Sequence, residues 1–399
     1  MIRIVHVTSG LGVGGAETML YRLLGDLASI PNQEHFVITL TPGCEFNFDR
    51  IGVKVRVIDL KQLGVLGLLT LRRIVHSLRP DIVQGWMYHG NIAATFSAPS
   101  GVPVVWGIHH SLHHLCNEKR SIRILVRLGK WLSGYRRTHR IVYVSEASRT
   151  HHNSYGYQAS KALVIPNGFD CNYFRPDPIL RATTRLRLGV EPYHLLVGSF
   201  GRFHPVKDHK TLIRAFAQVV ERIPTARLAL AGSNIDVSND ELVNQLVFHG
   251  VADKVILLGL CFDMPSLYNA LDLYVLSSLS ESFPNVLGES CAVGVPCITS
   301  DVGDAARIVE GTGRVVPPGD ALALAQAIAL FLEQQPVQRI ATGQRARTHI
   351  VTHFSLAAAV SAYNTLYEGL AIHSGEAFAV TEVQPSLISE EDESRNLSA

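Results

Sequence analysis

The stretch ESFPNVLGE, residues 281–289, decides how the rest of the chain is interpreted. It follows an apolar run, Leu271 to Leu276, which predicts a buried strand. Proline is favoured in the first turn of a helix, so Pro284 predicts that a helix begins there. Two glutamates, Glu281 and Glu289, therefore lie around a helix N-terminus, one in the loop before it and one more than a turn inside.

This helix end is a candidate anion site. The backbone N–H groups of Asn285, Val286 and Leu287 are expected to be free there, where they can receive a group such as a diphosphate. A carboxylate this close to an anion is unfavourable unless it binds hydroxyl groups or a cation. A sugar nucleotide supplies both the diphosphate and the hydroxyls. Two ordinary acids flanking a helix would explain the same spacing, so other motifs must decide.

A second segment, GRFHPVKDH at residues 201–209, follows the first predicted strand of the C-terminal half. Arg202 and Lys207 are expected at the carboxyl end of that strand, where open α/β sheets bind their ligands. Two fixed cations can neutralise the charge that grows on a departing diphosphate. No divalent metal is needed if these two side chains supply that charge, so we expect no metal cofactor.

A glycine-rich segment, GLGVGG at residues 10–15, follows the first strand of the chain and precedes a helix. It can be written as the dinucleotide fingerprint G-x-G-x-x-G, but that interpretation needs an acidic residue at the end of the second strand. The second strand ends instead in LTP, residues 40–42, which weakens the case for an NAD site. Gly14 and Gly15, followed by Ala16 and Glu17, would alternatively let the backbone approach a ligand across a cleft. A flexible turn between strand and helix is the remaining explanation.

Together these segments resemble the motifs of the retaining glycosyltransferases of family 4, group 1, which are E-x7-E, G-R-x-x-x-x-K-D and G-G-A-E. Ser282 departs from the family's usual glycine, although a small residue is retained. The resemblance implies an α/β protein of the GT-B fold, with two Rossmann-like domains facing a cleft. It also implies a C-terminal helix that crosses back to the first domain. In that family the first glutamate faces the donor sugar and the second holds the ribose of the nucleotide.

The segment WGIHH, residues 106–110, ends a strand of the first half. The resemblance implies a histidine here that faces the donor sugar. His109 is the better match, and His110 remains an alternative because the register is uncertain by one. Histidines four positions apart share a helix face, so a metal site is an alternative interpretation of His109, His110, His113 and His114. No cysteine or paired carboxylate completes such a site apart from Cys116 and Glu118, and we expect no metal.

Two series of short β-branched runs alternating with helical patterns predict two parallel sheets covered on both faces. The first series predicts strands at 2–8, 36–41, 53–59, 81–85, 104–107, 142–145 and 162–165, and helices at 16–29 and 66–78. After PNGFD at 166–170, the second predicts strands at 195–201, 227–232, 255–258, 273–276, 297–299 and 314–316, and a helix at 209–222. We therefore divide the chain into an N-terminal acceptor-side domain (1–170) and a C-terminal nucleotide-sugar domain (171–353). A crossover helix (354–372) and an acidic tail (373–399), which we expect to be disordered, complete it.

The composition is that of a globular protein, since 47% of the 399 residues are apolar and 18% are charged. The formal net charge is +2, but residues 374–399 carry six acidic side chains against Arg395 alone, so the body is more basic. Six cysteines without a CxxC pair, and a first strand with no leader before it, lead us to expect a cytoplasmic protein. The apolar stretch Leu63 to Leu71 is too short to span a membrane and is closed by Arg72 and Arg73.

Residues 119–140 carry eight basic side chains and no acidic one. Five residues of this segment fall on one helical stripe: Ile122, Leu125, Val126, Gly129 and Leu132. Such a basic amphipathic helix can lie on an anionic membrane, here the inner face, or receive a lipid-linked acceptor. A solvated helix packed on the first domain explains the pattern equally well. Nucleic acid is not expected, because no recognition motif accompanies the charge.

The combined prediction is a metal-independent glycosyltransferase that moves a sugar, with retention, from a nucleotide diphosphate sugar to a saccharide or lipid-linked acceptor. Bacterial surface polysaccharide or glycolipid synthesis is the setting that the resemblance implies. The residues expected in catalysis are His109, Arg202, Lys207 and Glu281. The residues expected to bind the donor are Gly14, Gly15, Phe283, Asn285, Val286, Leu287 and Glu289. Three alternatives stay open: an NAD-dependent oxidoreductase, a sugar-nucleotide epimerase on the same fold, and a nucleotide-sugar-binding protein without catalysis.

Overall fold

The first half of the chain forms a parallel sheet of seven strands in the computed structural model, which describes residues 1–12, 14–113, 115 and 119–372. The strand order is β3-β2-β1-β4-β5-β6-β7. The bounds are β1 Ile2–Thr8, β2 Gln33–Thr39, β3 Lys54–Val57, β4 Ile82–Trp86, β5 Val104–Ile108, β6 Thr138–Tyr143 and β7 Ala162–Val164. Every residue of β4 and β5 is buried, as expected for central strands covered by helices on both faces.

The second half forms a parallel sheet of six strands in the order β10-β9-β8-β11-β12-β13. The bounds are β8 Leu195–Phe200, β9 Ala226–Ala231, β10 Val255–Leu257, β11 Leu273–Leu276, β12 Cys297–Ser300 and β13 Arg314–Val316. In chain order this is 3-2-1-4-5-6, the Rossmann arrangement, in which the strand order reverses between β8 and β11. The predicted fold, with two Rossmann-like domains, is confirmed.

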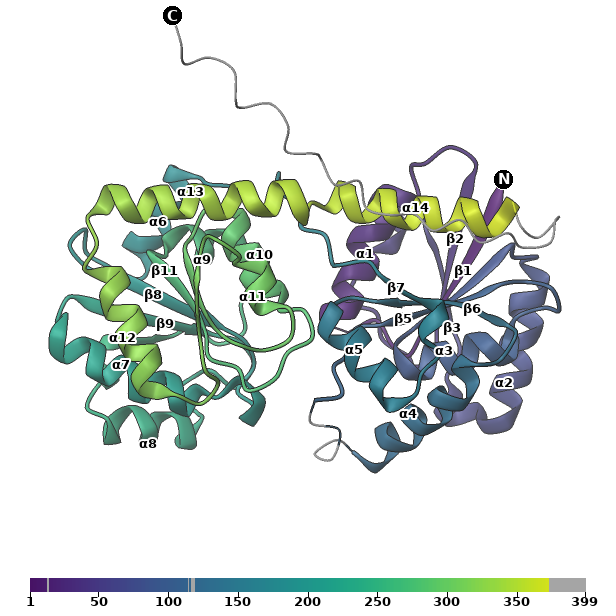
Figure 1. Ribbon diagram of the computed structural model, residues 1–399, viewed down its shortest axis with the longest axis horizontal. Coiled ribbons are helices and arrows are strands. Elements are labelled where there is room, and N and C mark those ends of the chain that lie inside the picture. The colour runs from purple at the N-terminus through teal and green to yellow at the C-terminus, as the bar shows by residue number, and fades with distance from the viewer. Residues whose placement is uncertain (13, 114, 116–118, 373–399) are drawn as a thin grey trace, which may run out of the picture.

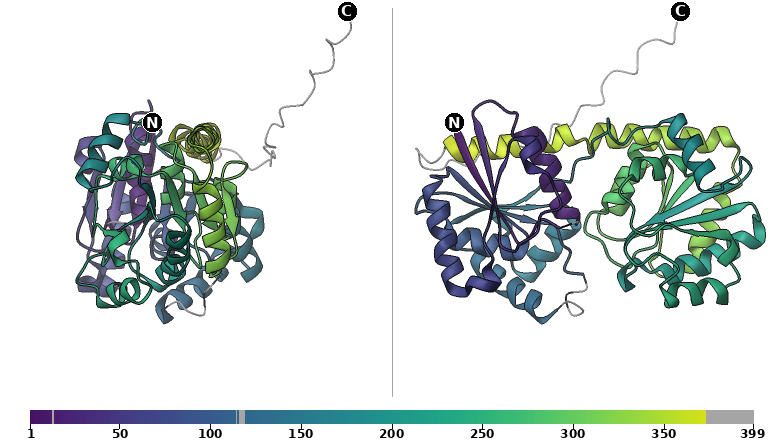
Figure 2. Two further views of the ribbon diagram at one scale, coloured as in Figure 1. Left: turned by 90° about the vertical axis from the view of Figure 1, so that its left-hand side faces the viewer. Right: turned by 180° about the vertical axis from the view of Figure 1, so that it is seen from behind.

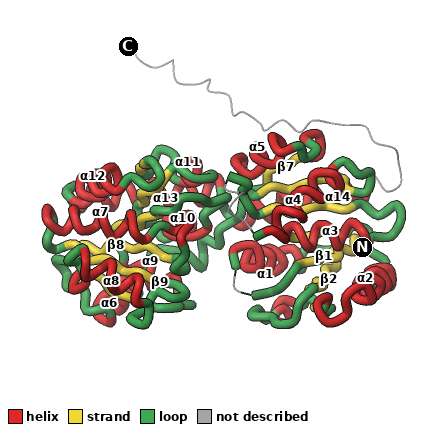
Figure 3. The backbone as a smooth tube through the Cα atoms, turned by 90° about the horizontal axis from the view of Figure 1, so that it is seen from below, coloured by secondary structure: helices red, strands yellow, loops and turns green. Residues whose placement is uncertain are grey.

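Helices cover both sheets (Figures 1 and 3). In the first domain they are α1 Gly15–Leu27, α2 Leu60–Ser77, α3 Met87–Ser97, α4 Arg120–Ser133 and α5 Glu146–Tyr155. In the second they are α6 Pro178–Arg187, α7 His209–Arg222, α8 Asp240–Phe248, α9 Met264–Ala270, α10 Asn285–Ala292, α11 Ala305–Ile308, α12 Ala321–Leu332 and α13 Pro336–His353, followed by α14 Leu356–Ile372.

The prediction placed the start of β6 four residues late, because its first residues, Thr138 to Arg140, are polar or charged.

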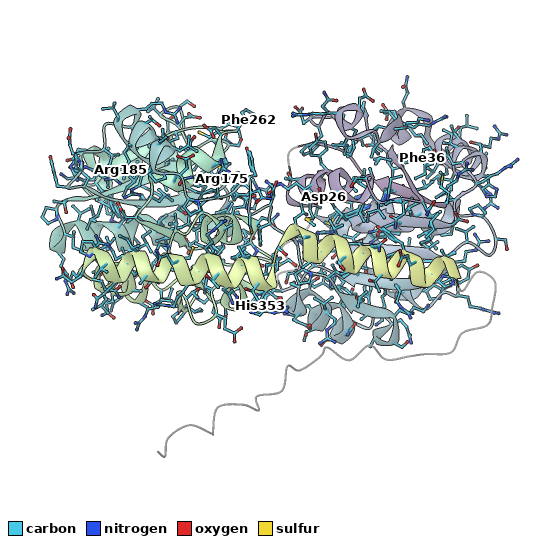
Figure 4. The ribbon with its side chains drawn as sticks, turned by 90° about the horizontal axis from the view of Figure 1, so that it is seen from above. Asp26, Phe36, Arg175, Arg185, Phe262 and His353 are labelled. Atoms are coloured by element: carbon cyan, nitrogen blue, oxygen red, sulfur yellow. The ribbon has the colours of Figure 1, made fainter. Side chains whose placement is uncertain are left out.

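The last helix returns to the first domain, as predicted. Figure 2 shows α13 along the second domain and α14, in yellow, along the first, and Figure 4 places His353 at their junction. α14 packs against α1, β1 and β4, and its Tyr363 and Tyr367 are buried there. The two connections between the domains pair with each other: the Phe169 N–H donates to the Phe354 carbonyl (2.8 Å), and Leu356 N–H donates to the Phe169 carbonyl (2.9 Å). We propose boundaries at 170 and 353 for this reason.

The predicted acidic tail, 373–399, lies outside the described residues. No helix within the described part of the chain is long and apolar enough to cross a membrane.

Candidate active site

An ion pair marks the point where the strand order of the second sheet reverses. Lys207 lies in the loop after β8, and Glu281 lies in the loop after β11, the neighbouring strand. Lys207 Nζ is 2.6 Å from Glu281 Oε1, and both side chains are largely buried. The Ser278 hydroxyl donates to the same carboxylate oxygen (2.8 Å). The structure thus brings together two residues predicted to act in catalysis, at the edge where open α/β sheets bind ligands.

Neighbouring loops hold this pair in place. The Ser277 hydroxyl donates to the Lys207 carbonyl (2.9 Å), which ties the β11 loop to the β8 loop. Gly303, with φ of 54°, lies against the carbonyls of Glu281 and Ser282, and a Cβ there would come within 2.6 Å and 2.4 Å of them. A glycine is required at that turn because both the backbone angle and the contact exclude a side chain. The carboxylate is therefore positioned by three loops.

Arg202 stands beside this pair in sequence, but its side chain is exposed. Its guanidinium has no hydrogen bond or ion pair with the residues that the structure describes. A fixed cation next to it, Lys207, is already paired with a carboxylate. Arg202 is thus the basic residue of the motif that can accept an incoming anion without first breaking a contact.

Helix α10 begins at the predicted place. Pro284 is its N-cap residue, immediately before the first helical residue, Asn285. The amides of Asn285 and Val286 have no hydrogen bond within the described structure, whereas Leu287 N–H donates to the Pro284 carbonyl (3.0 Å). The prediction of three free amides is therefore wrong for Leu287, because the first turn tightens around its cap. The Phe283 side chain lies in the core, stacked on Phe169, so this residue can offer a ligand only its backbone.

The first domain approaches this helix at Gly15, the first residue of α1. A Cβ on Gly15 would lie 3.3 Å from Asn285 Nδ2, so the absence of a side chain leaves room at the interface. Asn285 Oδ1 also accepts a hydrogen bond from Asn167 Nδ2 (2.8 Å), at the domain junction. Gly14 is the N-cap of α1, and a Cβ there would meet the flexible Glu17 side chain. The start of α1, with Gly14 and Gly15, thus lies next to Asn285 at the start of α10. All three residues were predicted to bind the donor.

The second glutamate of the motif is bridged to the opposite domain. Glu289 Oε1 accepts from Arg22 Nη1 of α1 (2.9 Å), and Oε2 accepts from the Tyr268 hydroxyl of α9 (3.0 Å). The Arg22 guanidinium lies over the Phe174 ring, 5.1 Å from its centroid. Glu289 is buried, so its charge requires such a partner. Neither Arg22 nor Tyr268 could be identified from the sequence, because neither belongs to a motif.

His109 is the first residue after β5. Its ring stacks on Trp86, with centroids 5.2 Å apart, and its Nδ1 is buried without a hydrogen-bond partner in the described part of the chain. Burial lowers the pKa of His109 to about 4, so the ring is neutral near pH 7. Within the described residues, no three His, Cys, Asp or Glu side chains are grouped as a metal site would need. His114, Cys116 and Glu118 lie outside those residues.

A further contact between the domains joins the turn after β12 to the start of α5. The Asp304 carboxylate, after β12, accepts from the backbone N–H groups of Glu146 and Ala147, both at 3.0 Å. These are the first two amides of α5, while the Ser145 hydroxyl accepts from the third, Ser148. One domain thus caps a helix of the other, an arrangement favoured by the positive helix N-terminus.

The glycine loop after β1 does not fit an NAD site. The Thr41 hydroxyl, just past β2, donates to the Ser9 carbonyl (2.8 Å) in the region where a ribose-binding acid would be needed. A Cβ on Gly10 would lie 2.9 Å from that hydroxyl oxygen. Neutral Thr41 therefore occupies the position at this end of the sheet where an NAD site would need an acidic residue.

Both halves of the chain match models of known protein families. Residues 13–173 match the model for Glycosyltransferase Family 4, and residues 194–334 match that for Glycosyl transferases group 1. The putative glycosyltransferase EpsF of Bacillus subtilis is 24% identical over 344 residues, covering 83% of this chain and 86% of EpsF. The lipopolysaccharide core biosynthesis mannosyltransferase LpcC of Rhizobium leguminosarum is 32% identical over 215 residues, 52% of this chain and 59% of LpcC.

Solved structures share the fold. HepE of Anabaena, crystallised with UDP and glucose, superposes with a TM-score of 0.81 at 23% identity, covering 92% of this chain and 100% of HepE. WaaG, described as a glycosyltransferase involved in lipopolysaccharide biosynthesis, gives 0.72 at 16% identity, covering 92% of this chain and 99% of WaaG. The oxidoreductase, epimerase and non-catalytic alternatives are not favoured by these matches. Both halves of the chain match these families and the fold agrees, so the protein belongs to the group 1 glycosyltransferases of family 4, with the GT-B fold.

Proposed function

We propose that this glycosyltransferase takes its sugar from a nucleoside diphosphate sugar and transfers it with retention at the anomeric carbon. The observation that carries the proposal is the Lys207–Glu281 pair at the strand-order reversal. Among the described residues, Arg202 beside it has no ion pair, and the amides of Asn285 and Val286 at the N-terminus of α10 have no hydrogen bond. Cations and amides together suit a diphosphate, and a carboxylate suits sugar hydroxyls. Relatives named galactosyltransferase and mannosyltransferase support this class of donor.

Each residue then has a role. Arg202, Lys207 and the two free amides of α10 bind the diphosphate, and Lys207 also holds Glu281 toward the sugar. Glu289 accepts hydrogen bonds from the ribose hydroxyls. Neutral His109 and the bare backbone of Gly14 and Gly15 close the site from the first domain.

Retention is assigned to front-face transfer. Glu281 is held through one oxygen by Lys207 and Ser278, which makes it a poor nucleophile for a covalent intermediate. In the proposed step the bond between the anomeric carbon and the phosphate oxygen breaks, and the acceptor oxygen bonds on the same face. The acceptor proton passes to the leaving phosphate oxygen, while Arg202 and Lys207 stabilise the negative charge that develops there.

The experiment has two stages. Calorimetric binding of UDP, GDP and ADP first shows whether a nucleoside diphosphate binds and which base is preferred. NMR of the product made from the matching nucleotide sugar then gives the anomeric configuration. A retained configuration is expected, and an inverted product would refute front-face transfer.

The proposed acceptor is a saccharide or a lipid-linked saccharide of a bacterial surface polysaccharide or glycolipid. Support comes from the relatives, whose names include lipopolysaccharide core mannosyltransferases and a galactosyltransferase that acts on a diphosphoundecaprenol-linked sugar. Comparison of bare and lipid-linked saccharides as acceptors, with the same donor, tests the proposal. Transfer to neither would reject it.

A peripheral membrane contact is proposed for the outer face of α4. The predicted apolar stripe, including Val126 and Leu132, is packed against the first domain. The opposite face nevertheless exposes further apolar side chains, Ile124 (55%), Leu128 (37%) and Trp131 (71%), and Tyr135 (47%) is exposed just beyond the end of the helix. Exposed cations surround them: Arg120, Arg123, Arg127, Lys130 and Arg136. An exposed aromatic and aliphatic row among arginines matches an anionic lipid surface.

Vesicle sedimentation tests this contact. The protein should bind vesicles of phosphatidylglycerol and phosphatidylcholine more strongly than pure phosphatidylcholine, and Trp131→Ala should weaken binding. Phe248→Ala provides the matched control, because this aromatic side chain is 84% exposed on the second domain. Equal binding by wild type and Trp131→Ala, or loss in the control, would reject α4 as the membrane face.

A further inference from the structure

Arg22 reaches the nucleotide side of the site from the first domain. It lies on α1, and its partner Glu289 lies on α10 of the other domain, 267 positions along the chain. We propose that Arg22 is a donor-site positioning residue: it holds Glu289 so that the carboxylate accepts both hydroxyls of the ribose, and it thereby favours ribonucleotides over 2′-deoxyribonucleotides. This inference rests on the proposed function, which assigns the ribose to Glu289.

The hydrogen-bonding capacity of the carboxylate permits this arrangement. An ionised carboxylate has about four lone-pair sites, two on each oxygen. Arg22 occupies one site on Oε1, and Tyr268 occupies one on Oε2. One site is left on each oxygen. A ribose diol has two adjacent O–H donors, so it can fill the remaining sites without displacing either protein partner.

The surroundings fix the direction of the carboxylate. Tyr268 is fully buried, and burial raises the pKa of its hydroxyl well above the ordinary value, so it stays a donor. The Arg22 guanidinium is held over the Phe174 ring, which limits its rotation. Figure 4 shows Asp26, one turn beyond Arg22 on α1, on the side of the first domain that faces Arg175 of the second. Arg22 therefore acts from a rigid helix at the interface between the domains.

A competing arrangement makes the opposite prediction. If the ribose needed the space of Arg22, the ion pair would have to break before the donor could bind. Removal of Arg22 would then strengthen nucleotide binding. The proposal requires that removal weakens it, and that the loss depends on the 2′-hydroxyl.

Isothermal titration calorimetry distinguishes these cases. The wild type is titrated with UDP, GDP and ADP, and the tightest of these is then compared with its 2′-deoxy form in wild type, Arg22→Gln and Arg22→Lys. Loss of a positioned, charge-assisted contact should weaken the ribonucleotide about 5- to 20-fold in Arg22→Gln and the deoxynucleotide less, so that their affinity ratio falls. In Arg22→Lys part of the affinity ratio between the ribonucleotide and the deoxynucleotide should return, because lysine keeps the positive charge but lacks the planar set of N–H donors of the guanidinium.

Arg3→Gln is the matched control, because Arg3 forms a half-buried ion pair with Glu34 in the same domain, away from the proposed donor site. It should leave both affinities unchanged. Tighter binding by Arg22→Gln would show that Arg22 competes with the ribose. Equal weakening of both nucleotides, at an unchanged unfolding temperature, would reduce Arg22 to a general contact and overturn the proposal. Unchanged affinities in Arg22→Gln would overturn it as well. If wild type binds none of the three nucleotides, the proposed function itself fails, and the inference with it.

Discussion

The two glutamates of the site are each paired with a cation, but the pairs are built differently. Lys207 and Glu281 come from adjacent loops of one sheet and lie 2.6 Å apart. Arg22 and Glu289 come from different domains and lie 2.9 Å apart. The first pair lies within the second domain, whereas the second can form only where the two domains meet. The sugar end of the site is therefore expected to be preformed, and the ribose end to depend on closure.

Substitution of Lys207 should give the largest effect. Lys207→Ala removes a cation from the departing diphosphate and leaves Glu281 with the Ser278 hydroxyl, so turnover should fall about 10²- to 10³-fold. The variant should still fold, but its unfolding temperature should fall, because the largely buried Glu281 carboxylate loses its cation. Steady-state kinetics and calorimetry check both, with exposed Lys210 on α7 as the matched control, Lys210→Ala. Turnover close to wild type would remove Lys207 from the mechanism.

Substitution of Glu289 should act on binding more than on turnover. Glu289→Gln keeps the shape but removes the charge that Arg22 and the ribose share, so nucleoside diphosphate affinity should fall about 10- to 100-fold. Titration calorimetry measures the loss. If turnover at saturating donor fell as far as after Lys207→Ala, the division between a sugar end and a ribose end would be wrong.

Asp304 tests whether the ribose end depends on closure. Asp304→Ala leaves two amides of α5 without their partner and should cost about 2 kcal/mol of stability. Because closure also forms the Arg22–Glu289 pair, nucleotide affinity should fall several-fold, by an amount that shrinks when Arg22 is already Gln. Additive losses in the double variant would mean that the two contacts between the domains are independent.

The smallest effect concerns pH. Unfolded histidine takes up a proton near pH 6.5, while buried His109 does so only near 4, so stability is unaffected above 6.5 and is lost as the pH falls between these values. His109→Asn should remove about 1 kcal/mol of this loss at pH 5.5, measured by denaturant titration at pH 7.5 and 5.5. Through the range from pH 6 to 8, His109 should contribute no ionisation to the rate profile. If the rate of the wild type changed with pH in this range and the rate of His109→Asn did not, the ring would titrate between pH 6 and 8 and the prediction would be wrong.

Motifs at strand ends could be predicted from the sequence, because the chain order of parallel strands places consecutive loops at one edge of a sheet. Lys207 and Glu281 follow β8 and β11, which are neighbours, so their meeting follows from the fold class. The start of α10 at Asn285 was recognisable from Pro284 for local reasons. These features need no knowledge of how the domains meet.

Contacts across the domain interface could not be predicted in this way. Arg22 has no special neighbours in sequence, and its partner is set by the relative placement of two separately folded sheets. Nothing in the segments around Ser145 and Asp304 indicates that the carboxylate of one caps the helix that follows the other. The amide of Leu287 was misjudged for a smaller reason, since the last detail of a cap depends on backbone angles that proline alone does not set.

The paired connections at Phe169 and Phe354–Ser355 limit how this enzyme can move. Two tethers that are hydrogen-bonded side by side resist sliding and stretching but still allow rotation about their common line. Gly168 tightens the joint, because a Cβ there would come within 2.5 Å of the Leu356 Cα. We therefore expect any opening of the domains to be a rotation described mainly by one angle. A spectroscopic distance between one label on each domain would accordingly follow the whole motion.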